Sequence, residues 1–245
     1  MFILIITSCL AFHFLNILFS VYIHLTTYMH YFCSMHEKII ILDFGSQYTQ
    51  LIARRIRELN VYCEIHPWNK IPVLDVNVKG VILSGSPFST LDKNAPYPNL
   101  DLIKGKFPLL GICFGSQFLS KNYGGEVLPS KIREYGRANL SSVNSNSILL
   151  DGISVDSQVW MSHGDTIISA PNDSTVICST KDVHIAGFRF NNENTFGIQF
   201  HPEVYHTKGG LQIMKNFIVS ICNCSQDWTP ASFVDETVND LKLKL

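Results

Sequence analysis

Continuous apolar runs alternate with segments of helical apolar spacing from residue 38 onward. Residues 39–42 are four consecutive apolar side chains, which is typical of a strand buried on both faces of a sheet. Apolar residues in 48–59 recur at helical spacing and leave polar residues on the opposite face. The same patterns predict further strands at 61–65, 80–83 and 107–110, and helices at about 98–105 and 115–123. This alternation predicts an α/β fold, with a doubly wound, mostly parallel sheet and flanking helices.

Short apolar segments dominate the second half of the chain. A helix from Lys208 to about Ile221 is expected to close the domain. In doubly wound sheets, ligands bind where the strands end at their carboxyl edge. We therefore expect the turns that follow the strands to form the functional site. The strands predicted in this half lie at roughly 126–128, 147–149, 158–161, 175–179, 184–190 and 196–200.

Residues 1–34 differ in composition from the rest of the chain. No Lys, Arg, Asp or Glu precedes Glu37, and the stretch exceeds the ~20 apolar residues that span a bilayer. It lacks the basic flank and small-residue cleavage site of a secretory signal, and the flanking cations of a stable anchor. We expect an apolar N-terminal extension outside the native domain, and membrane association is not expected. One domain is predicted over 35–225.

Composition and charge exclude several classes of protein. The net charge is −1 and the basic residues do not cluster, so no nucleic-acid surface is expected. The cysteines are odd in number and scattered along the chain, which matches neither a disulfide framework nor the paired Cys-x-x-Cys motifs of a structural metal site. We expect a reducing, cytoplasmic location and no metal. The seven cysteines are Cys9, Cys33, Cys63, Cys113, Cys178, Cys222 and Cys224.

Cys113 lies between two glycines, directly after an apolar run and before a predicted helix. A nucleophile at a sharp strand-to-helix turn needs small residues on both sides, and Gly111 and Gly115 supply them. The helix N-terminus favours the thiolate, which is the reactive form of cysteine. This spacing alone is a weak signal, because an inert buried cysteine also fits it. Cys113 is therefore a candidate nucleophile.

His201 and Glu203 follow the predicted strand 196–200. Residues i and i+2 of an extended chain point to the same side, about 6 to 7 Å apart along it, and Pro202 excludes a helix here. Glu203 can then orient His201, which acts as general base and acid for a cysteine nucleophile. A core histidine and a solvated carboxylate are the alternatives for each residue alone. Their occurrence with Cys113 favours a cysteine hydrolase.

These motifs are similar to those of class I, triad-type glutamine amidotransferases, which have a flavodoxin-like fold. The family is marked by Gly111-Ile112-Cys113-Phe114-Gly115-Ser116-Gln117, by His201-Pro202-Glu203 and by Ser84-Gly85-Ser86-Pro87. Three longer stretches, at 41–55, 133–136 and 159–165, resemble more narrowly the amidotransferase domain of the GMP synthase family. The resemblance runs from about Glu37 to the end of the chain.

The resemblance implies glutamine as the substrate, hydrolysed through a glutamyl thioester on Cys113. Backbone NH groups of Phe114 and Ser86 would bind the oxyanion. Most relatives carry a second glycine where this chain has Ser86, which can serve unless that position needs a positive φ. By the resemblance, His163 would be a structural or signalling residue and not a catalytic one. The implied substrate-binding residues are Gln117, Ser162, Gly164 and Asp165.

The last twenty residues, 226–245, resemble a linker and the truncated start of an ATP pyrophosphatase (synthetase) domain. Thr229 and Pro230 make an N-cap and first-turn pair for a helix with one apolar face. The resemblance implies that this missing domain would use ATP, Mg and the released ammonia to convert XMP to GMP, with no cofactor on this chain. A gene fragment and a naturally split enzyme of two chains both fit. The alternatives are an amidotransferase for another synthase (anthranilate, carbamoyl phosphate or CTP), against which the stretch 41–55 argues, and a silent regulatory module. The intact Cys113, His201 and Glu203 argue against the silent module.

Overall fold

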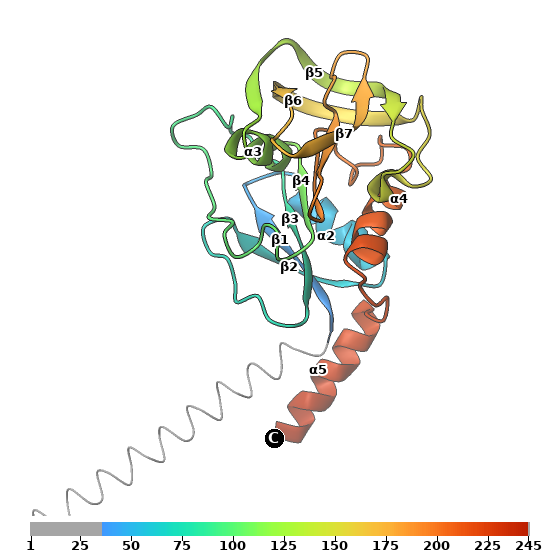
Figure 1. Ribbon diagram of the computed structural model, residues 1–245. Coiled ribbons are helices and arrows are strands. Elements are labelled where there is room, and N and C mark those ends of the chain that lie inside the picture. The colour runs from blue at the N-terminus through green and yellow to red at the C-terminus, as the bar shows by residue number, and fades with distance from the viewer. Residues whose placement is uncertain (1–35, 245) are drawn as a thin grey trace, which may run out of the picture. The chain divides into compact units, whose positions relative to one another are not determined.

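A nine-stranded mixed sheet forms the centre of the protein in the computed structural model, which describes residues 36–244 (Figure 1). The expectations for residues 1–34 lie outside the described residues. The strand order is β2-β1-β3-β4-β9-β8-β7-β5-β6. The strands are β1 (Lys38–Asp43), β2 (Tyr62–Pro67), β3 (Val78–Leu83), β4 (Leu109–Ile112), β5 (Glu126–Val143), β6 (Gln158–Ser169), β7 (Ser174–Thr180), β8 (Gly187–Phe190) and β9 (Thr195–Ile198).

The parallel half of the sheet consists of β2, β1, β3, β4 and β9. In β1, Ile39 and Ile41 pack into one apolar cluster and Ile40 and Leu42 into another, because successive side chains of a strand point to opposite faces. Helix α2 (Thr49–Glu58) packs in the first cluster and helix α3 (Phe114–Asn122) in the second. Helices therefore cover both faces, and the predicted doubly wound α/β fold is confirmed.

Strands β5 to β8 add an antiparallel half to this sheet. β5 pairs with β6 along most of its length, and the register shifts between Pro129 and Glu134. These two strands are much longer than the predicted segments 126–128 and 158–161. Their polar outer positions break up the apolar pattern, because one face of an antiparallel sheet can be solvated.

Two predicted elements are wrong. Residues 98–105 form no helix: turns begin only at residue 101, with the NH groups of Ile103 and Lys104 both donating to the carbonyl of Leu100. Gly105 then adopts a left-handed φ of +73°, which ends the helical path after one turn. Residues 147–149 form no strand: a turn at Asn144 leads into a short 3-10 helix, η1 (Ile148–Leu150).

The C-terminal helices were predicted correctly in place and type. The helix expected over 208–221 is α4 (Gly210–Lys215), which continues as one π-helical segment, η2 (Asn216–Ile221). Helix α5 (Pro230–Lys244) begins as expected, because the NH of Ser232 donates to Oγ1 of Thr229 over 3.0 Å. Among the described residues, no helix combines the length and apolarity that crossing a membrane requires.

Candidate active site

Cys113 occupies a strained turn between β4 and α3. Its φ of +52° and ψ of −104° lie outside the regions that non-glycine residues ordinarily adopt. A Cβ at Gly111 would lie 2.6 Å from the backbone of Gly115, and a Cβ at Gly115 would lie 2.6 Å from Leu83. Both flanking glycines are therefore required by close packing, which holds the turn and presents the Cys113 thiol at the end of β4.

Replacing Gly115 with alanine is expected to lower the free energy of unfolding by at least about 2 kcal/mol, because the new methyl group collides with the backbone of β3. Chemical denaturation measures the change. Gly164→Ala is the matched control, because a Cβ there would meet nothing closer than the Tyr135 hydroxyl at 3.9 Å. Equal stability of the two variants would contradict the close packing at Gly115.

His201 and Glu203 form a buried pair at the end of β9. Nδ1 of His201 lies 2.7 Å from Oε1 of Glu203, and the two residues are only 2% and 1% exposed. Burial lowers the pKa of His201, but the negative charge of Glu203 and the interaction with the Cys113 sulfur outweigh it and hold that pKa well above its usual range. The imidazole is therefore suited to exist as an imidazolium beside the Glu203 carboxylate.

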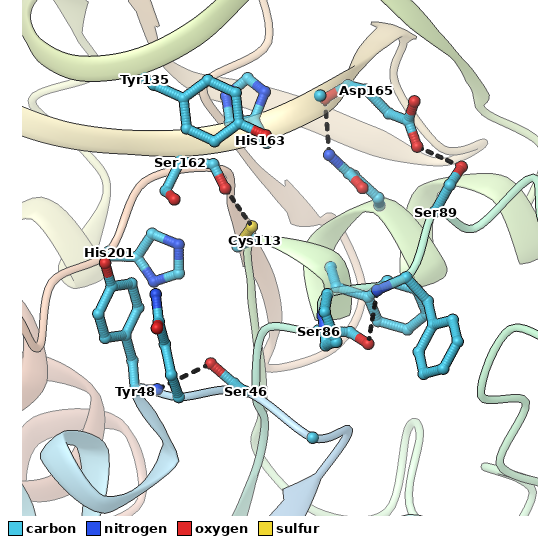
Figure 2. Close-up of a pocket in the computed structure, with 17 residues that line it drawn as sticks. Ser46, Tyr48, Ser86, Ser89, Cys113, Tyr135, Ser162, His163, Asp165 and His201 are labelled. Atoms are coloured by element: carbon cyan, nitrogen blue, oxygen red, sulfur yellow. Dashed lines mark hydrogen bonds between the residues drawn. The ribbon is translucent and has the colours of Figure 1, made fainter.

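A cavity of about 490 Å³ opens in front of Cys113 at the carboxyl edge of the parallel strands (Figure 2). The Cys113 thiol points into it and lies 3.7 Å from the carbonyl oxygen of Ser162 on β6. Glu203 lies behind His201 and does not line the cavity. The remaining sequence-predicted site residues all line it, namely Ser86, Cys113, Phe114, Gln117, Ser162, Gly164, Asp165 and His201.

The two candidate oxyanion donors come from different elements. Phe114 is the first residue of α3, where backbone NH groups have no intrahelical partner. Ser86 is not among the described non-glycine residues with a positive φ, so a serine is tolerated at this position. Its Oγ donates to the carbonyl of Phe44 over 2.8 Å and accepts from the NH of Phe88 over 3.2 Å. The serine side chain therefore anchors the loop that carries the NH group.

Gln117 and Asp165 are linked on the opposite wall of the cavity. Nε2 of Gln117 donates to the backbone carbonyl of Asp165 over 2.7 Å, and Ser89 donates to the Asp165 carboxylate (Figure 2). The cavity thus combines the Asp165 carboxylate, the side-chain amides of Gln47 and Gln117, and several backbone groups. Such a lining suits a small polar molecule with an ammonium group.

Tyr48, Ser89 and Tyr135 also line the cavity but were not identified as site residues from the sequence. The Tyr48 ring packs edge-on against His201, with ring centroids 5.0 Å apart. Tyr48 lies within the distinctive stretch 41–55, and Tyr135 within 133–136, so those resemblances were the available signal. No sequence signal pointed to Ser89, because its hydrogen-bond partner Asp165 is remote in sequence.

Burial lowers the pKa of His163 to about 4 from an ordinary 6.5. The unfolded chain therefore binds a proton below about pH 6.5 that the folded protein binds only near pH 4. Between these values stability falls as the pH falls, by roughly 3 kcal/mol in total from this residue.

His163→Gln should weaken this acid dependence, which denaturation curves at several pH values between these limits would measure. Equal slopes of unfolding free energy against pH in both proteins would contradict the assignment.

Comparisons with known proteins agree with this geometry. The family model described as glutamine amidotransferase class-I matches residues 40–221. Curated relatives include a GMP synthase (glutamine-hydrolyzing) of Cytophaga hutchinsonii, 58% identical over 211 residues, and one of Bacteroides thetaiotaomicron, 54% identical. Each alignment covers 86% of this chain and 42% of the relative. The chain thus spans less than half the length of these curated relatives.

Two solved structures have the same fold. One is a Thermoplasma acidophilum protein described as a candidate GMP synthase subunit, with a TM-score of 0.65 and 32% identity. The alignment covers 77% of this chain and 94% of that one. The other is a Thermotoga maritima glutamine amidotransferase, with a TM-score of 0.58 and 23% identity, covering 77% and 83%. By its sequence, its fold and the residues around Cys113, this chain belongs to the class I glutamine amidotransferase family.

Proposed function

We propose that this chain is the glutamine-hydrolysing part of a GMP synthase. The observation that carries the proposal is the buried Cys113, His201 and Glu203 constellation, which opens onto a polar cavity of amino-acid size. Glutamine would bind with its amino-acid end near Gln117, Ser162, Gly164 and Asp165 and with its carboxamide carbon at the Cys113 sulfur.

The first half-reaction forms the thioester. The Cys113 thiolate attacks the carboxamide carbon, and the resulting oxyanion accepts hydrogen bonds from the NH groups of Phe114 and Ser86. The His201 imidazolium gives its proton to the leaving nitrogen as the C–N bond breaks, which releases ammonia and leaves a glutamyl thioester. Glu203 keeps the ring oriented and supports its positive charge.

The second half-reaction returns the enzyme to its starting state. His201, now neutral, takes a proton from water, and the hydroxide equivalent attacks the thioester carbon. The C–S bond breaks, glutamate leaves, and the Cys113 thiolate again faces a protonated His201. Each turnover thus consumes glutamine and water and yields glutamate and ammonia.

We further propose that the ammonia serves a synthetase part, distinct from the amidotransferase region described above. The GMP synthases that the chain matches are more than twice the length of the alignment. An ATP pyrophosphatase part, holding ATP and Mg, would adenylate XMP and accept the ammonia to give GMP, and no cofactor would bind to this chain. The reaction would take place in the cytoplasm, where thiols stay reduced, and the five cysteines that the structure describes are all unpaired.

Glutamate release from glutamine tests the proposal, measured with the chain alone and with a synthetase part, ATP and XMP. We expect turnover that rises when the partner and its substrates are added. Ammonia transfer to a different acceptor, such as chorismate or UTP, with none to XMP would indicate an amidotransferase for another synthase. Absence of turnover in every mixture would favour a silent regulatory module.

A further inference from the structure

Thr207 lies six residues after His201, in the turn that leads to α4, and is only 5% exposed. Its hydroxyl uses both hydrogen-bonding functions. Oγ1 donates to the backbone carbonyl of His201 over 2.5 Å and accepts from the backbone NH of Trp160 over 3.0 Å. The hydroxyl therefore connects the backbone of the candidate base to strand β6.

Trp160 holds both backbone polar groups of His201. The carbonyl of Trp160 accepts directly from the NH of His201 over 3.0 Å, whereas its NH reaches the carbonyl of His201 through the Thr207 hydroxyl. Without that hydroxyl, the buried carbonyl of His201 and the partly buried NH of Trp160 would lose these hydrogen bonds, which costs free energy. The backbone of His201 would then be held to β6 by its NH alone, and its carbonyl end could shift relative to the strand.

The same strand also holds the nucleophile. Two residues beyond Trp160, the carbonyl of Ser162 lies 3.7 Å from the Cys113 sulfur (Figure 2). Base and nucleophile are thus both positioned against one short stretch of β6. The contacts of Glu203 fix the ring of His201, but they do not fix its backbone relative to this strand.

We propose that Thr207 is a positioning residue, whose hydroxyl sets the distance between His201 and Cys113 by tying His201 to β6. The inference rests on the proposed function and deepens it. A small displacement of a reacting group lowers the rate of the chemical step by about 10- to 100-fold without changing the affinity for the substrate. The effect should therefore appear in kcat and in the reactivity of Cys113, but not in KM.

The test compares three variants. Thr207→Val keeps the size of the side chain and removes the hydroxyl, and Thr207→Ser keeps the hydroxyl. Thr180→Val is the matched control, because Oγ1 of Thr180 is equally buried and accepts one backbone NH, from Val183, on β7 away from the cavity. Thr207→Ala replaces the valine variant if valine prevents folding.

The first readout is alkylation of Cys113 by iodoacetamide at about pH 6, where an unpaired thiol is almost fully protonated. Peptide mass spectrometry separates Cys113 from the other cysteines. We expect Thr207→Val to react about tenfold slower than the unaltered chain, and Thr207→Ser and Thr180→Val to stay within about threefold of it. For glutamine hydrolysis, Thr207→Val should lower kcat by about 10- to 100-fold with KM unchanged.

Thr207→Val with unaltered Cys113 alkylation would overturn the proposal. So would Thr180→Val slowing it equally, or Thr207→Ser failing to rescue it, because each result would reduce Thr207 to a stabilising residue. The alkylation readout does not depend on glutamine. If alkylation follows the expected order but no protein releases ammonia from glutamine, the proposed function fails and the positioning role stands.

Discussion

Replacing Cys113 with alanine is expected to lower kcat for ammonia release from glutamine by about 10⁵-fold, to the limit of detection. The sulfur is the atom that would bond to the carboxamide carbon, and among the described residues no other side chain lining the cavity carries a thiol. Without it, His201 has no nucleophile to activate. Coupled detection of ammonia and of glutamate measures the loss, and circular dichroism shows whether the variant is folded.

Cys178→Ala is the control for that experiment. Burial raises the pKa of the Cys178 thiol to about 12, so this cysteine stays protonated and unreactive in the core. We expect its loss to affect stability but not kcat. Comparable ammonia release by Cys113→Ala and the unaltered chain would show that the hydrolysis does not use Cys113.

Replacing Glu203 with glutamine should lower kcat by about 10³- to 10⁴-fold with little change in KM, by analogy with a triad whose carboxylate is neutralised. The carboxylate is buried, contacts Nδ1 of His201 and lies outside the cavity. Its loss removes one of the charges that hold the pKa of His201 well above the usual range. Because ammonia leaves only with a proton from the imidazolium, the alkaline limb of the pH–rate profile should move to lower pH.

Steady-state kinetics across pH measures this shift. Glu193→Gln is the matched control, because it breaks a carboxylate–ammonium pair with Lys104 in the turn between β8 and β9. The raised pKa of His201 also stabilises the folded state below the unfolded pKa of about 6.5, and this contribution is lost as the pH rises through the folded value. An unchanged alkaline limb in Glu203→Gln would contradict the role assigned to this carboxylate.

The sequence predicted the parallel half of the sheet because its strands are buried on both faces. Runs such as residues 39–42 contain no polar interruption, and α2 and α3 carry clear apolar faces. The prediction of a helix at 98–105 was wrong because the apolar residues of this segment suit one turn only. Gly105 then ends the helical path with a positive φ. The long strands β5 and β6 were underestimated because their stability comes from pairing with each other, which a local pattern does not record.

The site was predictable where its chemistry is local in sequence. The glycine-flanked turn at Cys113 is a weak signal alone, but its occurrence with the neighbouring pair His201 and Glu203 made it a candidate nucleophile. The structure brings all three residues together. Ser89 and Thr207 were not predictable in the same way. Ser89 donates to Asp165, 76 residues away, and Thr207 accepts from Trp160, 47 residues away, so only the folded chain brings these residues together.

The reaction of Cys113 with a chloroketone analogue of glutamine tests the central claim most directly. The analogue presents an electrophilic carbon in place of the carboxamide, so it labels whichever nucleophile faces the bound amino acid. We predict a single label on Cys113, which excess glutamine prevents and asparagine does not. Labelling of another cysteine, or labelling of Cys113 that glutamine leaves unaffected, would contradict the assignment of this cavity as a glutamine site.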